Sequence, residues 1–271
     1  MIDRPPCDRP RCRLLAGMLA LSGLLSLLSA CQRPVVPEPR AAVPTKAVAR
    51  GDILWHFVHD QCVPNAQAGK NPPSPCVKVD LNNRYVIFKD KNGPLQYLHM
   101  PTDHVTGLED PRVANAPRTA YFAQAWHNRD YMDQQLGRPV PLQDYSLTIN
   151  SKTGRSQNHL HIHISCVRPA LRDRLTARHT NFNSSWQPVP GGIGGHNYRV
   201  RTISLEELTS PGAIVLTTRT LAGAKRHMDQ LSLALYPLSE RRFLLFATQG
   251  IGASAEGDFQ DHRCPQLLAT Q

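Results

Sequence analysis

The sequence predicts an α+β fold built on an antiparallel sheet. Short apolar or alternating segments, bounded by Gly, Pro, Asn or Asp, indicate strands, and one long amphipathic stretch indicates a helix. The two kinds of segment follow one another irregularly, whereas a parallel sheet would need regular alternation. Residues 46–271 suffice for a folded part with a proper core, and we expect one shared core.

Each expected element is a segment whose apolar positions repeat with the period of a strand or a helix. The expected strands are residues 84–89, 95–100, 146–150, 159–167, 213–218, 231–236 and 242–247. The expected helices are residues 120–136, with Trp126 and Met132 among the apolar positions, and a shorter one over 221–229. The order after Ala213 is strand, helix, strand, strand, which we interpret as a C-terminal extension of the sheet.

The first 31 residues have the pattern of an export signal. Several arginines precede an uncharged apolar run at 14–30, which ends in Leu28-Ser29-Ala30-Cys31. A positive start, an apolar run and small residues before a cysteine indicate a lipobox, with Cys31 as the lipidated residue. An uncleaved signal anchor is the alternative, although the run is short for the ~20 residues that span a bilayer. In both cases we expect anchoring to a membrane, on the periplasmic face of a bacterial cell envelope.

Residues 32–45 are rich in proline and show no periodicity, so we expect an extended tether. The expected organisation is therefore a signal or anchor over 1–31, a tether over 32–45 and a folded part over 46–271.

The folded part contains an even number of cysteines: Cys62, Cys76, Cys166 and Cys264. In an oxidising compartment four cysteines allow three pairings. We favour two disulfides, with Cys62 and Cys76 closing a short loop and Cys166 joined to Cys264. A zinc site is the alternative, but the close C-x-x-C pairs typical of such sites are absent from the sequence.

The most informative segment is Asn158-His159-Leu160-His161-Ile162-His163-Ile164, where histidine alternates with aliphatic residues. In a strand the three imidazoles would share one face and the aliphatic side chains would pack on a core. One metal ion cannot bind all three histidines, since the outer two would lie ~13 Å apart and zinc needs each nitrogen at ~2.1 Å. Metal binding by two of them remains an alternative.

Phosphate chemistry explains the row of histidines better. The charge of a phosphoanhydride is spread over several oxygens, so successive donors along a strand can each meet a different oxygen. Neutral imidazole is also an adequate nucleophile toward phosphorus, and a covalent intermediate divides one difficult displacement into two easier ones.

From His159 to Ile164 the segment resembles the signature H-φ-H-φ-H-φ-φ of the histidine triad superfamily of nucleotide hydrolases and transferases. It departs at Ser165, where that superfamily usually has an apolar residue. The resemblance implies that His161 is the nucleophile and that His159 and His163 orient it and contact phosphate. Gly154-Arg155-Ser156 resembles the G-Q-S element, which implies phosphate contacts from Ser156 and Gly154, with Arg155 in place of Gln. Asn150 resembles the asparagine that supports the site.

Several separate stretches further resemble the CDP-diacylglycerol pyrophosphatases, membrane-associated enzymes of bacteria. They are residues 62–65, 93–98, 149–155, the histidine segment through Cys166, 186–192 and 261–264. This resemblance implies hydrolysis of CDP-diacylglycerol to CMP and phosphatidate through a nucleotidyl-histidine, with no cofactor or metal required. A hydrolase of soluble nucleotides and an exported metal-binding lipoprotein are the alternatives.

The superfamily resemblance also implies an antiparallel half-barrel with helices on one side. Histidine triad proteins often pair two half-barrels in a dimer. Because a second triad is absent from the sequence, we expect the C-terminal extension to supply the partner surface, giving a monomeric pseudo-dimer with one site.

The formal net charge is +10, and part of it lies in the signal region. This charge fits attraction to an anionic bilayer and to a pyrophosphate, or simple solubility. Neither an RNA-binding motif nor a basic run interleaved with aromatic residues is present, so we expect no nucleic-acid partner.

Overall fold

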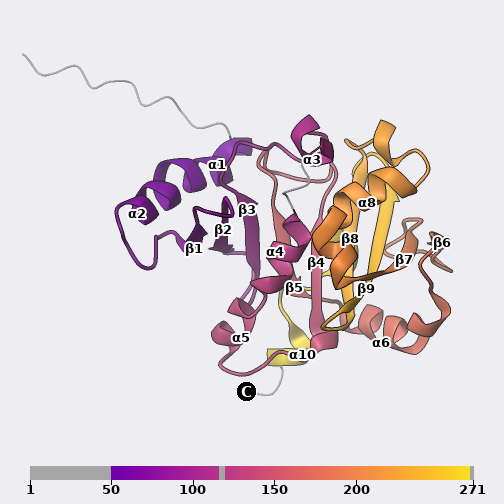
Figure 1. Cartoon of the computed structure of the whole chain (residues 1–271). Coiled ribbons are helices and arrows are strands. Elements are labelled where there is room, and N and C mark those ends of the chain that lie inside the picture. The colour runs from indigo at the N-terminus through magenta and orange to yellow at the C-terminus, as the bar shows by residue number, and fades with distance from the viewer. Residues whose placement is uncertain (1–49, 116–119, 269–271) are drawn as a thin grey trace, which may run out of the picture. The chain divides into compact units, whose positions relative to one another are not determined.

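The computed structural model describes residues 50–115 and 120–268, which build a nine-stranded antiparallel sheet (Figure 1). The strands lie in the order β1-β2-β3-β5-β4-β8-β9-β7-β6. They are β1 (Cys76–Asp80), β2 (Tyr85–Lys89), β3 (Tyr97–Pro101), β4 (Tyr145–Ile149), β5 (Ile162–Cys166), β6 (Gln187–Pro188), β7 (Arg199–Ser204), β8 (Leu231–Ser239) and β9 (Arg242–Gln249). Among these residues the sheet ends at β1 and β6 and does not close into a barrel.

The helices are short. They are α1 (Ile53–Phe57), α2 (Val63–Gln67), α3 (Pro111–Asn115), α4 (Tyr121–His127), α5 (Tyr131–Leu136), α6 (Pro169–Arg178), α7 (Leu205–Glu207), α8 (Ala213–Thr220), α9 (Ala255–Phe259) and α10 (Pro265–Leu268). Tighter or wider helical turns are η1 (Arg50–Asp52), η2 (Val58–Cys62), η3 (Leu142–Asp144), η4 (His179–Asn181), η5 (Leu208–Gly212) and η6 (Ala224–Arg226). In the part of the chain that the structure describes, none of the helices has the length and apolar character needed to span a membrane.

The expected signal over 1–31, with its lipidation site Cys31, and the expected tether over 32–45 lie outside the described residues. Lipidation of Cys31 and an uncleaved signal anchor therefore remain the two alternative predictions for the amino terminus.

Most expected strands are present within three residues of their predicted bounds, as β2, β3, β4, β8 and β9. The strand expected at 213–218 was wrong, because this segment forms α8. Its residues are buried on every side, and a short, mostly apolar run does not distinguish a strand from a buried helix. The hydroxyls of Thr217 and Thr220 donate to the carbonyls of Ala213 and Leu216, so the helix satisfies these polar groups internally.

The helix expected at 120–136 is divided into α4 and α5. At the break, the side-chain amide of Asn128 donates to the carbonyl of Gln124 and to the hydroxyl of Tyr85, and so ends α4. The helix expected at 221–229 was also largely wrong, since only the turn η6 forms there. Gly223, at φ +81°, precedes η6 and separates it from α8.

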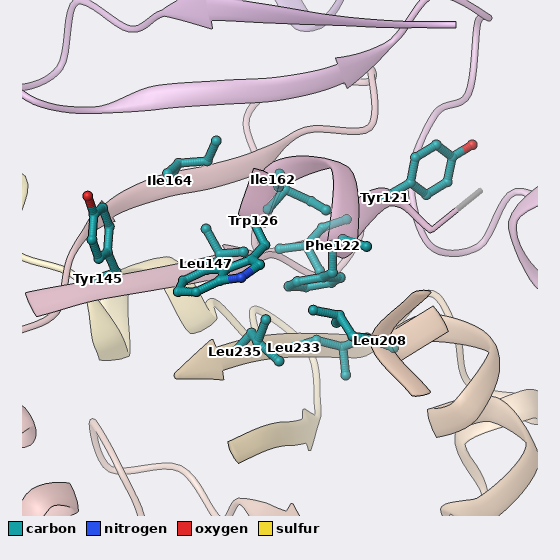
Figure 2. Close-up of a cluster of buried hydrophobic side chains, with 14 of the residues drawn as sticks. Tyr121, Phe122, Trp126, Tyr145, Leu147, Ile162, Ile164, Leu208, Leu233 and Leu235 are labelled. Carbon is teal, nitrogen blue, oxygen red and sulfur yellow. The ribbon is translucent and has the colours of Figure 1, made fainter. Parts of the chain in front are cut away.

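One face of the sheet packs on α4 and α8 in the central core. Figure 2 shows Phe122 and Trp126 of α4 between Ile162 and Ile164 of β5 and Leu233 and Leu235 of β8. These strand residues alternate with side chains that point to the opposite face, as the period of two requires. The aliphatic half of the histidine segment is therefore buried in the core, as the sequence predicted.

The opposite face is covered by two further clusters, so the expectation of helices on one side only was wrong. An N-terminal cluster brings α1 and η2 onto β2 and β3; its residues are Leu54, Val58, Cys62, Cys76, Val86, Leu98 and Met100. A C-terminal cluster brings α6 and α9 onto β8 and β9; its residues include Val167, Leu171, Leu175, Ala234, Tyr236, Leu244, Phe246, Ala255 and Phe259. The polar side chains of β5, His163 and Ser165, belong to neither cluster.

The C-terminal extension continues the sheet, because β8 pairs antiparallel with β4 through Leu147 and Leu235. The order strand, helix, strand, strand exists, but it is made by β7, α8, β8 and β9.

Both favoured disulfides are confirmed. Cys62 and Cys76 join η2 to β1, and Cys166 at the end of β5 joins Cys264 just before α10.

Candidate active site

A cavity of about 960 Å³ opens on the sheet face opposite α4. Its lining residues divide by chemistry into a polar group, which we call the floor, and an apolar group, which we call the wall. The floor is lined by Asn150, Gly154, Ser156, Gln157, His161, His163 and Glu256, together with the basic and polar residues Lys89, Asp90, Lys91 and Asn92; the wall is lined by Ile53, Leu54, Phe57, Phe88 and Leu98. Its place follows from the fold, since it occupies the face between the N-terminal and C-terminal clusters.

The three histidines do not form one row on a strand. Strand β5 begins only at Ile162, so His161 lies just before it and His159 lies in a bend. His161 and His163 line the cavity, with ring centroids 4.8 Å apart. The ring of His159 does not line the cavity; its Nε2 lies 3.0 Å from the carbonyl oxygen of Pro101, and its face packs near Trp55. The expected strand over 159–167 is therefore too long at its start.

The imidazole of His161 has a defined tautomer. Its Nδ1 lies 2.6 Å from the carbonyl oxygen of His159, and only a protonated nitrogen can donate to a carbonyl. The neutral ring therefore carries its proton on Nδ1 and keeps the lone pair of Nε2 free. Burial lowers the pKa of His161, which favours this neutral form at pH 7.

His163 has the opposite tautomer. The side-chain amide nitrogen of Gln96 lies 3.0 Å from a carboxylate oxygen of Asp90, so it is the donor, and it also lies 3.0 Å from Nδ1 of His163. Because Nδ1 accepts, the neutral ring carries its proton on Nε2. That atom lies 3.2 Å from Oε2 of Glu256, although without hydrogen-bond geometry. Burial lowers the pKa of His163 to about 3.

Asn150, directly after β4, holds Glu256 in the cavity. Its amide nitrogen donates to Oε2 of Glu256 at 2.8 Å, and its oxygen accepts from the backbone N–H of Glu256 at 3.1 Å. Gly154 lies where the following loop crosses Ala253, and a Cβ at this position would stand 2.2 Å from the carbonyl oxygen of Ala253. Ser156 is exposed on the cavity floor.

Arg155, like His159, was predicted to contact phosphate but does not line the cavity. Its guanidinium donates to both carboxylate oxygens of Glu109, at 2.9 and 2.5 Å, and its side chain is only 4% exposed. The contacts of Arg155 therefore hold the loop in place and do not support a phosphate-binding role.

Among the described residues, no group of three His, Cys, Asp or Glu side chains is arranged to hold a metal ion.

Comparison with known proteins identifies the family of this chain. A family model described as CDP-diacylglycerol pyrophosphatase matches residues 49–268. The chain belongs to the CDP-diacylglycerol pyrophosphatase family. It is accordingly a hydrolase that acts on an acid anhydride, and the family supports hydrolysis of CDP-diacylglycerol and a place in lipid metabolism.

Among solved structures, a chain named Hnt3 is similar at 20% sequence identity with a TM-score of 0.30, and the match covers 45% of this chain and 66% of that chain. A structure of Hnt3 in complex with DNA and guanosine matches with the same values.

In this CDP-diacylglycerol pyrophosphatase, sequence reasoning did not identify Glu256 or Gln96 as parts of the site. Gln96 lies in one of the family-like stretches, 93–98, and His262 lies in another, 261–264. The structure brings these stretches together, since Gly93 packs directly against the backbone of His262. The presence of both stretches in the sequence was the signal that could have pointed to Gln96 and His262. Glu256 lies in none of the stretches and carries no signal of its own.

The charge of Glu256 is fixed by its neighbours. Burial by itself would raise its pKa, but hydrogen bonding to His262 and Asn150 and the nearby His163 lower it to about 2. A carboxylate therefore faces the cavity at neutral pH, beside the histidines.

Proposed function

We propose that this cavity hydrolyses CDP-diacylglycerol by the chemistry of the histidine triad superfamily, with His161 as the nucleophile. Nε2 of His161 attacks the phosphorus nearest cytidine, phosphatidate leaves, and the resulting CMP-histidine is then hydrolysed by water. The observation that carries this proposal is the tautomer of His161. The bond from Nδ1 to the carbonyl of His159 leaves Nε2 unprotonated, as a nucleophile must be.

The neighbours of His161 support distinct roles. The hydroxyl of Ser156 is an exposed donor in the cavity lining that can meet a phosphate oxygen, whereas Nε2–H of His163 lies buried beside Oε2 of Glu256. Lys89 and Lys91 add positive charge at the same cavity. His159 acts on the nucleophile through its backbone carbonyl, and Asn150 acts by holding Glu256.

Membrane attachment belongs to the same proposal. The apolar wall beside a polar floor suits a substrate that has both a pyrophosphate and apolar parts. Part of that wall, Ile53, is 41% exposed on α1, the first α-helix after the expected tether. We place the enzyme at the periplasmic face, held by lipidated Cys31. Mass spectrometry of the mature protein tests whether Cys31 carries a lipid. Cell fractionation tests the membrane attachment, and Cys31→Ala should be released from the membrane.

The protein acts as a monomer with one site. The pairing of β8 with β4 within one chain supports an internal partner for the catalytic half. Light scattering that gave an obligate dimer would overturn this part of the proposal.

The central experiment incubates the purified protein with CDP-diacylglycerol and measures CMP and phosphatidate. His161→Ala should lose activity by at least ~10³-fold while its thermal unfolding stays close to that of the wild type. Wild-type turnover by this variant would refute the nucleophile assignment. Equal rates with CDP-alcohols or dinucleotides would favour the soluble-nucleotide alternative, and loss of activity in EDTA would favour the metal-dependent one.

A further inference from the structure

A line of hydrogen-bonded side chains leads from the cavity into the protein through the C-terminal segment. Oε1 of Glu256 lies 2.9 Å from Nε2 of His262, and Nδ1 of His262 lies 3.0 Å from the hydroxyl of Ser165. Glu256 and His262 are each 25% exposed, whereas Ser165 is buried. Only the carboxylate end of this line reaches the cavity lining.

The chemistry of the proposed reaction needs a base in one of its two steps. In the first step neutral His161 attacks through a free lone pair, and phosphatidate leaves as an anion, so no proton has to be removed. In the second step water attacks phosphorus and must lose a proton, while His161 leaves with its proton still on Nδ1. A general base therefore accelerates only hydrolysis of the CMP-histidine. This inference rests on the proposed function.

The other groups around the nucleophile are poorly placed for that task. Nε2 of His163 already carries the proton of its neutral tautomer, because Nδ1 accepts from Gln96. Asp90 is separated from His163 by Gln96, whose amide nitrogen lies 3.0 Å from an oxygen of Asp90 and 3.0 Å from Nδ1 of His163. Lys89 donates to two backbone carbonyls. The carboxylate of Glu256 lies directly against His163, on the same floor as His161.

We propose that Glu256 is the general base of the second step and that His262 and Ser165 are positioning residues that hold it. The oxygen of water bonds to phosphorus, the bond from phosphorus to Nε2 of His161 breaks, and its electron pair returns to Nε2. One proton of the water passes to Oε2 of Glu256, and the other stays on the new hydroxyl of CMP.

His262 holds Glu256 in position. Because Glu256 is a carboxylate, Nε2–H of His262 donates to Oε1, and Oε2 is the oxygen that lies beside His163. The hydroxyl of Ser165 can in turn donate to Nδ1 of His262. This contact gives a reason for the one departure from the histidine triad signature. An apolar residue at position 165 would leave Nδ1 of His262 without this partner.

The test separates the two steps. CDP-diacylglycerol labelled in the cytidine is mixed in molar excess with the enzyme, and phosphatidate release, CMP release and protein-bound label are followed in time. Glu256→Gln should release phosphatidate in a burst of about one per enzyme and release CMP ~10²-fold more slowly than the wild type. The label should accumulate on His161, where peptide mapping locates it.

Two further variants and a control sharpen the result. His262→Gln should slow CMP release in the same way, and Ser165→Ala should do so less, because Glu256 remains in both. Glu206→Gln is the matched control, since Glu206 lies on the surface with its side chain 64% exposed, and it should behave as the wild type.

The outcomes distinguish this inference from the proposed function. If Glu256→Gln slows both steps equally and no label accumulates, Glu256 is not the base of the second step. Wild-type CMP release by Glu256→Gln overturns the inference as well. If His161→Ala stays active and the wild type never carries label, the proposed function itself fails, whatever Glu256→Gln does.

Discussion

Nδ1 of His161 lies 2.6 Å from the carbonyl oxygen of His159, so the backbone of one histidine of the alternating segment sets the tautomer of the next. This contact is possible because the chain bends at His159 and enters β5 only at Ile162. The ring of His159 then points away from the cavity, toward Trp55 and the carbonyl of Pro101.

The first prediction concerns the different parts played by His159 and His161. His159→Ala keeps the backbone carbonyl that orients His161, and it loses only the ring that anchors the bend. Its kcat should fall by ~10-fold, far less than the loss expected for His161→Ala. Steady-state kinetics of both variants compare the two losses; equal losses would show that the ring of His159 takes part in the chemistry.

The second prediction concerns acid stability. Burial lowers the pKa of His99 to about 4 and that of His159 to about 3. Between pH 6.5 and 4 the unfolded chain therefore binds more protons than the folded protein, so stability rises with pH in this window and is lost on acidification. The contribution of His99 is on the order of 3 kcal/mol. Urea unfolding at several pH values should show this slope, and His99→Gln should flatten it; an unchanged slope would contradict the assignment to His99.

The third prediction tests the place of Arg155. Its loss leaves the partly buried Glu109 without its partner, so Arg155→Gln should lower the free energy of unfolding by about 3 kcal/mol. The double variant with Glu109→Gln should recover part of that loss. The free energy of unfolding and the KM are measured for the single and the double variant. A raised KM with unchanged stability would restore Arg155 as a phosphate ligand.

The fourth prediction concerns the two disulfides. Cys166 and Cys264 are separated by 98 residues and Cys62 and Cys76 by 14, so the chain-entropy model assigns ~4.7 and ~3 kcal/mol to them. The double substitution Cys166→Ser/Cys264→Ser should destabilise the protein more than Cys62→Ser/Cys76→Ser does. It should also slow turnover in the remaining folded protein, because Cys264 anchors the segment that carries His262. Equal turnover of the two variants under conditions where both stay folded would argue against that anchoring role.

Local pattern was enough to predict several features of the site and fold. The alternation from His159 to Ile164 fixed which side chains enter the core, because successive residues of an extended chain point to opposite faces. Leu160, Ile162 and Ile164 are buried as expected. The strands β2, β3, β4, β8 and β9 also followed from local composition. The short spacing of Cys62 and Cys76 favoured their pairing, which left Cys166 for Cys264. The family-like stretches identified the enzyme class.

Tertiary structure decided the features that depend on neighbours far away in the chain. The run at 213–218 forms a helix that is buried on every side. Local pattern does not encode that environment. Arg155 pairs with Glu109, 46 residues away, and so does not line the cavity. Glu256 reaches the histidines only because α9 packs beside β4 and Asn150 holds it there. A lone glutamate has no period or motif, so its role depends on three-dimensional contacts that the sequence by itself does not specify.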